Sequence, residues 1–211
     1  GITDNDKTEI DKNINSTISR LTNYQTPSGG FGYWPGDTLT NSWGSLYAGH
    51  FLIEASKLGY HVPENLLSKW KEHTRSQAIA AKDSLLVKSY TVYLLALAGS
   101  PEQGAMNQLK EGYLQEMEDR ERWLLAAAYK LAGHEKASRE ITKNAGIETR
   151  EYYEFSNTFG SGLRDKALIM NSAISTGDKK VVEKLFDLLG EHLSRSNWYS
   201  TQATGFMLLS V

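Results

Sequence analysis

The stretch Trp123-Leu124-Leu125-Ala126-Ala127-Ala128-Tyr129-Lys130-Leu131-Ala132 is apolar on nearly every side if it is wound into a helix. A helix without a polar face has to be buried among other elements. Its three consecutive alanines let neighbours approach closely, and Gly133 follows where a left-handed glycine would end the helix. Segments of the same character lie at residues 43–58, 85–98, 167–174 and 203–211. The sequence therefore predicts five buried helices.

A second kind of helix, with a single apolar stripe, precedes each buried one. Near the start of the chain Ile10, Ile14, Ile18 and Leu21 recur at spacings of three and four, among charged residues. Such spacing puts them on one face, opposite a solvated face. Similar stripes run through Leu66, Leu67 and Trp70; Met106, Leu109 and Tyr113; Ala137, Ile141 and Ala145; and Val181, Val182, Leu185, Leu188 and Leu189. About ten helices of two alternating kinds are expected, and strand signals are weak.

Glycines mark the turns between these helices. Gly59, Gly99, Gly133 and Gly177 each lie just past a buried helix, at intervals of roughly 40 residues, as in helical repeats. An open solenoid would not need whole helices buried on every side. We therefore predict an all-α fold, an α/α toroid of alternating inner and outer helices like that of terpenoid cyclases and prenyltransferases. A single domain is expected over residues 1–211.

Composition excludes several classes of function. The chain has no cysteine, so disulfides, thiol nucleophiles and cysteine-bound zinc are excluded. Its formal net charge of −2, with acids and bases interspersed, leaves no basic stripe for nucleic acid. The longest apolar run, residues 92–98, is far too short to span a bilayer. The five histidines form no paired metal-ligand spacing, so we expect no metal and no cofactor.

Aromatic residues gather in the connections that lead from a striped helix to a buried one. The connection at residues 24–41 holds Phe31, Tyr33 and Trp34, and the turn at residues 197–199 holds Trp198 and Tyr199. A third connection, residues 150–162, carries further aromatics. In an alternating barrel all such connections lie at one end. We therefore expect the three to share one aromatic rim.

This rim leaves open an alternative, a carbohydrate-active α/α toroid enzyme, and a helical-repeat interaction scaffold is a third possibility. Such an enzyme needs two carboxylates that face each other across a cleft. The rim candidates are Asp37, Asp83, Asp119, Glu151, Glu154 and Asp165. Each of them fits equally well as a helix cap or a solvated side chain. We expect no such acid pair in a deep groove.

Three segments together resemble a known family. Ser200-Thr201-Gln202-Ala203-Thr204, running into an apolar helix, looks like the last inner helix of the thioester domain in α2-macroglobulins and complement thioester proteins. The segment Gly29-Gly30-Phe31-Gly32-Tyr33-Trp34-Pro35-Gly36, followed by Ser42-Trp43, resembles a loop of the bacterial members. Phe159-Gly160-Ser161, with the helix that follows, is similar to a later loop-helix entry.

The resemblance implies a role and a missing part. Family members carry a toroid of twelve helices, trap proteases through a change of shape, and in many cases use a thioester of a Cys-x-Glu-Gln motif. That motif would lie on a helix before Asp6, so the chain is expected to be a thioester domain cut after it. Its partners would be proteases trapped by the parent protein and other domains of the same chain.

From these observations we predict part of a bacterial α2-macroglobulin-like endopeptidase inhibitor, without enzymatic activity in this segment. The expected location is the cell envelope, either periplasmic or anchored to the membrane through another part of the protein. Phe31, Tyr33, Trp34, Trp198 and Tyr199 are the candidate wall of the thioester pocket, because large aromatic side chains exclude water with few rotatable bonds.

Overall fold

The computed structural model describes residues 3–80, 83–195 and 198–211. Ten helices and no strand occur in this part of the chain. Two isolated antiparallel bridges, Gln25 with Phe31 and Tyr153 with Ser161, each close a loop. The helices are α1 (Asp4–Leu21), α2 (Ser42–Lys57), α3 (Glu64–Ala80), α4 (Leu85–Leu97), α5 (Gln103–Tyr113), α6 (Asp119–Leu131), α7 (Glu135–Thr142), α8 (Gly162–Thr176), α9 (Lys179–Ser194) and α10 (Thr201–Ser210).

Local signals in the sequence place the ends of these helices. The side chains of Asn41, Ser84, Ser161 and Ser200 each accept a hydrogen bond from a backbone N–H in the first turn of the inner helix that follows. Gly59, Gly99, Gly133 and Gly177 have φ angles of 89°, 71°, 85° and 82°. The predicted left-handed helix stops are thus confirmed.

The chain divides into two compact units, Gly1–Ala80 and Ala81–Val211, and each is described by itself. In the first unit α2 packs against α1 and α3. The indole of Trp70, on α3, is fully buried and donates a hydrogen bond of 2.9 Å to the carbonyl oxygen of Ser45. A Cβ atom on Gly49 would lie 2.0 Å from the Trp70 ring. Glycine is therefore what lets α3 approach α2 so closely.

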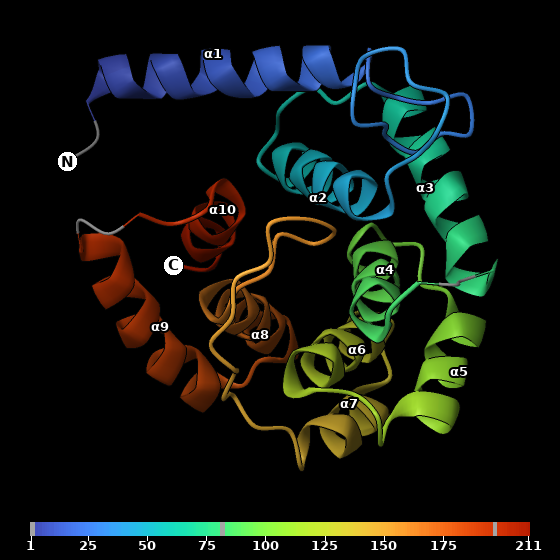
Figure 1. Cartoon of the computed structure of the whole chain (residues 1–211), viewed down its shortest axis with the longest axis vertical. Coiled ribbons are helices and arrows are strands. Elements are labelled where there is room, and N and C mark those ends of the chain that lie inside the picture. The colour runs from blue at the N-terminus through green and yellow to red at the C-terminus, as the bar shows by residue number, and fades with distance from the viewer. Residues whose placement is uncertain (1–2, 81–82, 196–197) are drawn as a thin grey trace. The chain divides into compact units, whose positions relative to one another are not determined.

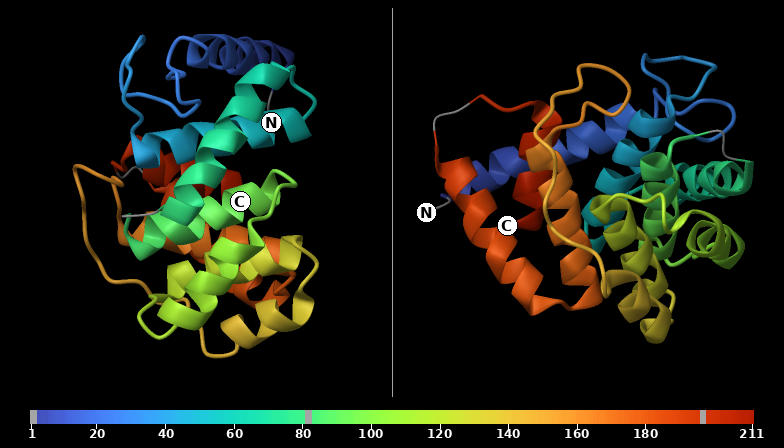
Figure 2. Two further views of the ribbon diagram at one scale, coloured as in Figure 1. Left: turned by 90° about the vertical axis from the view of Figure 1, so that its right-hand side faces the viewer. Right: turned by 60° about the horizontal axis from the view of Figure 1, so that its bottom comes forward.

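In the second unit α4, α6, α8 and α10 form the inner layer, and α5, α7 and α9 lie on its outer side (Figure 1). Leu94, Leu95, Leu124 and Leu125 are fully buried, as are the alanines at 126–128. The predicted alternation of buried and striped helices is confirmed here. The long connection from α7 to α8 extends past the N-terminal end of α8 (Figure 2, right).

Two details of the sequence prediction are wrong. The apolar stretch at residues 203–211 was expected to be buried on all sides, but Leu208 in the last turn of α10 is 64% exposed and Val211, just past the helix, is 48% exposed. The inner helices α6 and α8 begin four to five residues before their apolar stretches, with Asp119 and Gly162. Charged side chains can occupy these buried first turns because they pair with one another, as described next. The prediction of a single domain over 1–211 remains a prediction.

Candidate functional site

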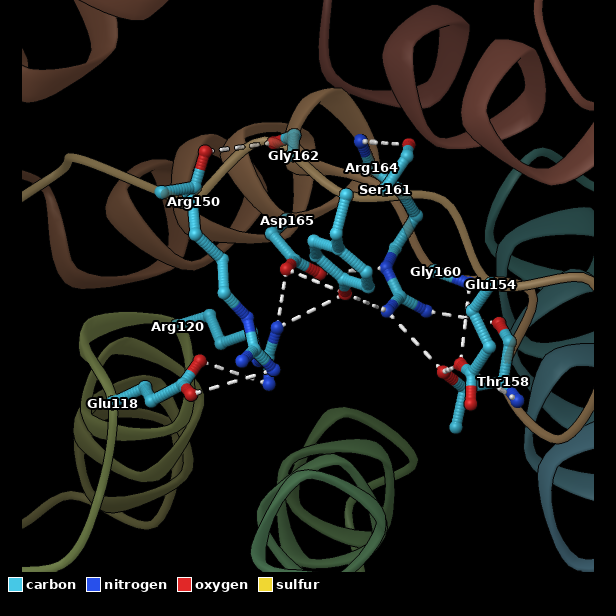
Figure 3. Close-up of polar contacts among 12 residues, drawn as sticks. Glu118, Arg120, Arg150, Glu154, Thr158, Gly160, Ser161, Gly162, Arg164 and Asp165 are labelled. Carbon is cyan, nitrogen blue, oxygen red and sulfur yellow. Dashed lines mark hydrogen bonds and ion pairs between the residues drawn. The ribbon is translucent and has the colours of Figure 1, made fainter.

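The N-terminal ends of α6 and α8 meet in the second unit, and a cluster of charged side chains joins them (Figure 3). Asp165 of α8 is 1% exposed and lies between two arginines. It accepts a hydrogen bond of 2.8 Å from Nε of Arg164 and a second one from Nη1 of Arg120. Arg164 and Arg120 are themselves 0% and 8% exposed. Three charges are therefore buried together, which is tolerable only because each is paired.

Tyr152 ties the connecting loop to this cluster. Its hydroxyl donates to Oδ2 of Asp165 over 2.8 Å. The hydroxyl oxygen of Tyr152 in turn accepts a hydrogen bond from Arg120 over 3.0 Å and one from Arg164 over 3.1 Å. Burial raises the pKa of the Tyr152 phenol, and the nearby carboxylate of Asp165 adds to this effect. The phenol is therefore a neutral donor that links both inner helices to the loop.

Glutamates complete the cluster on the α6 side. Nη2 of Arg120 lies 2.9 Å from Glu118, and Nε of Arg120 lies 3.5 Å from Glu121. The Glu121 carboxylate also accepts a hydrogen bond of 2.7 Å from the backbone N–H of Glu118. This bond is part of the capping box at the N-terminal end of α6. Burial raises the pKa of the Glu121 carboxyl, although the Glu118 N–H and Arg120 act in the opposite direction. For Arg120, burial lowers the pKa, but Asp165, Tyr152 and Glu121 together outweigh burial, so the net pKa is raised.

A pocket of about 350 Å³ opens beside this cluster. Its lining residues are Met117, Glu118, Asp119, Arg120, Arg122, Glu148, Thr149, Arg150 and Asp165. Of its acids, Asp165 is held by two arginines and Glu118 lies 2.9 Å from Arg120 and 3.7 Å from Arg150. Glycoside hydrolysis instead needs one carboxyl that gives up a proton and one that is free to act as a base or nucleophile. The pairing of these acids does not favour that chemistry.

Of the other rim acids, Asp119 lines the same pocket as Asp165, whereas Asp37 and Glu154 lie in loops. Asp37 Oδ2 accepts from the backbone N–H groups of Tyr33 and Trp34 over 2.9 and 2.8 Å, within the loop of the first unit. Glu154 accepts bonds from Thr158 and Gly160 within the loop of the second unit. Both acids organise loops. Among residues 3–80, 83–195 and 198–211, no group of three or more metal-binding side chains is present.

The structure places the five predicted wall residues in two separate loops. Phe31 is 2% exposed and anchors its loop from inside, whereas Tyr33 and Trp34 are 55% and 69% exposed, with ring centroids 6.2 Å apart. Trp198 is 80% exposed, and the hydroxyl of Tyr199 donates to the carbonyl oxygen of His192 over 3.0 Å. The first three belong to one unit and the last two to the other, so their common rim stays a prediction.

Sequence reasoning missed Arg120, Glu121 and Arg164 and noted Asp165 only as a rim acid. A signal was nevertheless present. Charged runs, Asp119-Arg120-Glu121-Arg122 and Arg164-Asp165-Lys166, stand directly before apolar stretches. Charges at the start of a helix that must be buried indicate a paired cluster rather than a solvated turn.

The chain was compared with known protein families, proteins and structures. No family model matches the chain. The α2-macroglobulin of Escherichia coli (strain K12) is 25% identical over 210 residues, which cover 92% of this chain and 13% of that protein. The chain thus spans only a small part of the length of this relative.

Solved structures show the same likeness in three dimensions. Native E. coli α2-macroglobulin, from domain MG7 to the C-terminus, matches 97% of this chain and 34% of its own, with a TM-score of 0.80 and 23% identity. Trypsin-activated E. coli α2-macroglobulin matches 92% of this chain and 14% of its own, with a TM-score of 0.76 and 23% identity. Salmonella α2-macroglobulin reacted with methylamine matches 91% of this chain and 13% of its own, with a TM-score of 0.76 and 22% identity.

The fold therefore defines an all-α chain of alternating inner and outer helices, and the predicted toroid fold class is confirmed. More particularly, the chain is similar to one segment of the α2-macroglobulin of E. coli.

Proposed function

We propose that this chain is the helical thioester-domain segment of a bacterial α2-macroglobulin-like protein that traps proteases. The likeness to native E. coli α2-macroglobulin, which covers 97% of the chain, carries the proposal. Two of the matching structures are of E. coli α2-macroglobulin that was activated by a protease, trypsin in one and porcine elastase in the other. Proteases and other domains of the same longer protein are therefore the proposed partners. The segment itself performs no turnover chemistry, and the arginine-paired acids of its pocket support this view.

The proposed location is the cell envelope. None of the described helices combines the length and the apolar character that are needed to cross a bilayer. Attachment to a membrane would then depend on another part of the protein. Fractionation of cells that express the full-length protein tests this proposal, and its recovery with cytoplasmic markers would contradict it.

Trapping is tested with the full-length protein that carries this chain. It is incubated with an equimolar amount of trypsin or elastase, and the remaining protease activity is measured on a small chromogenic peptide and on a large protein substrate. A trapped protease keeps its activity on the small substrate and loses it on the large one, because only the large one is excluded. The 211-residue chain alone is the control and should inhibit neither. Equal activity on both substrates in the full-length sample would refute trapping.

We further propose that Phe31, Tyr33, Trp34, Trp198 and Tyr199 wall the pocket of a thioester supplied by another part of the protein. The exposure of Tyr33, Trp34 and Trp198 supports this role, because these side chains are free to cover a neighbouring group. If the full-length protein holds a thioester, Trp34→Ala should release its thiol several times faster than wild type, as followed with a thiol reagent. Trp34→Phe, which keeps an aromatic ring, is the matched control. An unchanged rate in Trp34→Ala would contradict the proposed wall.

A further inference from the structure

The loop between α7 and α8 presents two large aromatic side chains to solvent. Phe155 is 80% exposed and Tyr153 is 66% exposed, and they stand two residues apart beside the bridge between Tyr153 and Ser161. Isolated exposed aromatics are common, but two of them on one loop form a local apolar projection. Residues of this type dominate binding energy when they enter a partner's pocket.

The base of this projection is held in place by its own hydrogen bonds. Glu154 accepts from the backbone N–H groups of Thr158 and Gly160 over 3.3 and 3.4 Å, and from the Thr158 hydroxyl over 2.5 Å. Nη1 of Arg164 donates to the carbonyl oxygen of Thr158 over 3.1 Å. Arg164 belongs to the buried cluster around Asp165, so the loop is fixed to the ends of the inner helices (Figure 3).

Backbone conformation also shows that the loop is constrained. Asn157 and Phe159 have φ angles of 52° and 49°, in the left-handed region. A bulky residue such as Phe159 seldom adopts this conformation, and it persists only where the surroundings enforce it. Gly160, next to it, has no room for a side chain, because a Cβ atom would lie 2.4 Å from the Tyr152 hydroxyl. The loop is therefore pre-organised before any partner arrives.

The loop of the first unit is built in the same way. There a carboxylate, Asp37, accepts from the backbone N–H groups of Tyr33 and Trp34, which are exposed. The loop is likewise closed by an isolated bridge, between Gln25 and Phe31. Two separate loops thus use an internal acid to hold a pair of projecting aromatics. This repetition indicates that the presentation of aromatic side chains is a property of the fold.

We propose that Tyr153 and Phe155 form a docking knob that inserts into an apolar pocket on another domain of the same, longer protein. This proposal rests on the proposed function, in which the chain is one segment of such a protein. The matched segment is only 13% of the E. coli relative, so that relative has ample chain outside it to supply a pocket. Glu154, between the two aromatics, directs its carboxylate to Thr158 and Gly160 within the loop, so the side chains that project are aromatic and the pocket that fits them is apolar. Pre-organisation lowers the ordering cost of docking.

Absence of cysteine from the chain makes a direct test possible. Ser156→Cys places a thiol at the exposed tip of the loop. Its rate of labelling by a maleimide is measured by mass spectrometry of the loop peptide, in the 211-residue chain and in the full-length protein. We expect labelling at least tenfold slower in the full-length protein. Ser194→Cys, exposed at the end of α9, is the control for general access to the chain.

A second variant separates docking from simple crowding. Phe155→Ala, added to Ser156→Cys in the full-length protein, should return the labelling rate to within about threefold of that in the chain alone. Equal rates in chain and full-length protein for Ser156→Cys would overturn the proposal. So would labelling of the chain alone that slows as its concentration rises, because the occupant would then be a second copy.

The trapping assay is read independently of this labelling. If labelling at position 156 is slowed but no protease is trapped, the docking proposal stands and the proposed function is refuted. Trapping without protection would refute the docking knob alone.

Discussion

At the scale of single residues, Asp165 is the clearest example of a charge that is buried because it is paired. It lies between Arg120 and Arg164, and all three are at most 8% exposed. A buried ion pair adds little net stability, but removing one partner leaves the others uncompensated. The cluster therefore specifies how α6, α8 and the loop at Tyr152 fit together.

Asp165→Asn should lower the free energy of unfolding by about 3 kcal/mol, because the neutral amide leaves two buried guanidinium groups without their carboxylate. Urea unfolding followed by circular dichroism measures the change. Asp187→Asn, exposed on α9, is the control and should stay within about 0.5 kcal/mol of wild type. A loss below about 1 kcal/mol for Asp165→Asn would show that the cluster is not electrostatically coupled to folding.

His50 on α2 is expected to make the stability of the first unit depend on pH. Burial lowers its pKa to about 3, and Lys57 adds to the effect. Nε2 of His50 lies 3.8 Å from Glu54, but burial outweighs this carboxylate. The unfolded chain takes up the proton near pH 6.5 and the folded one near pH 3. His50 therefore contributes stability above pH 6.5 that is progressively lost as the pH falls toward 3.

Between pH 7.5 and pH 5 this group alone should cost about 2 kcal/mol of unfolding free energy. His50→Gln should remove that part of the pH dependence, although it lowers stability at pH 7.5 through poorer packing. Urea unfolding at both pH values, followed by tryptophan fluorescence, gives the slope. His61→Gln, at an exposed position, is expected to keep the wild-type slope. The hypothesis fails if His50→Gln and wild type lose stability equally.

At the scale of elements, the loop before α8 depends on close backbone approach at Gly160. Tyr152 Oη and Arg164 Nη2 would lie 2.4 and 2.7 Å from a Cβ atom at this position. Gly190, within α9, has open space around its own Cβ position. Substitution by alanine should therefore destabilise the loop at Gly160 and stabilise the helix at Gly190.

Gly160→Ala should displace Tyr152 from the cluster and expose the loop to protease, with cleavage within residues 150–161 at least severalfold faster than in wild type. Limited proteolysis with mass spectrometry locates the cuts. Gly190→Ala should instead raise the free energy of unfolding by about 0.5–1 kcal/mol, since alanine favours a helix interior over glycine. Cleavage of the Gly160→Ala loop at the wild-type rate would mean that the hydrogen bonds of Tyr152 do not hold it.

At the scale of the whole molecule, the chain contains two compact units but was predicted to be a single domain. The first unit has 80 residues and three helices, and so small a chain buries a limited apolar core. We expect it to unfold together with the second unit. Differential scanning calorimetry should give one transition with a calorimetric enthalpy equal to the van't Hoff enthalpy. Two resolved transitions would establish two domains.

By itself, the sequence determined the helices, their alternation and their glycine stops. These are local matters, because a period of 3.6 residues and a left-handed glycine act within one or two turns. It also indicated the resemblance to bacterial α2-macroglobulins, through three short segments and their order. Positive φ angles occur, as such helix stops require, at Gly59, Gly99, Gly133 and Gly177.

Only the tertiary structure decided which charged residues are buried. Arg120 and Asp165 are 45 positions apart, and nothing in either local segment states that they meet. Their pairing lets α6 and α8 begin earlier than their apolar stretches suggest. The same holds for α10, where Leu208 is exposed although its helix is apolar on all sides. Burial depends on what packs against a helix, whereas periodicity describes only the helix itself.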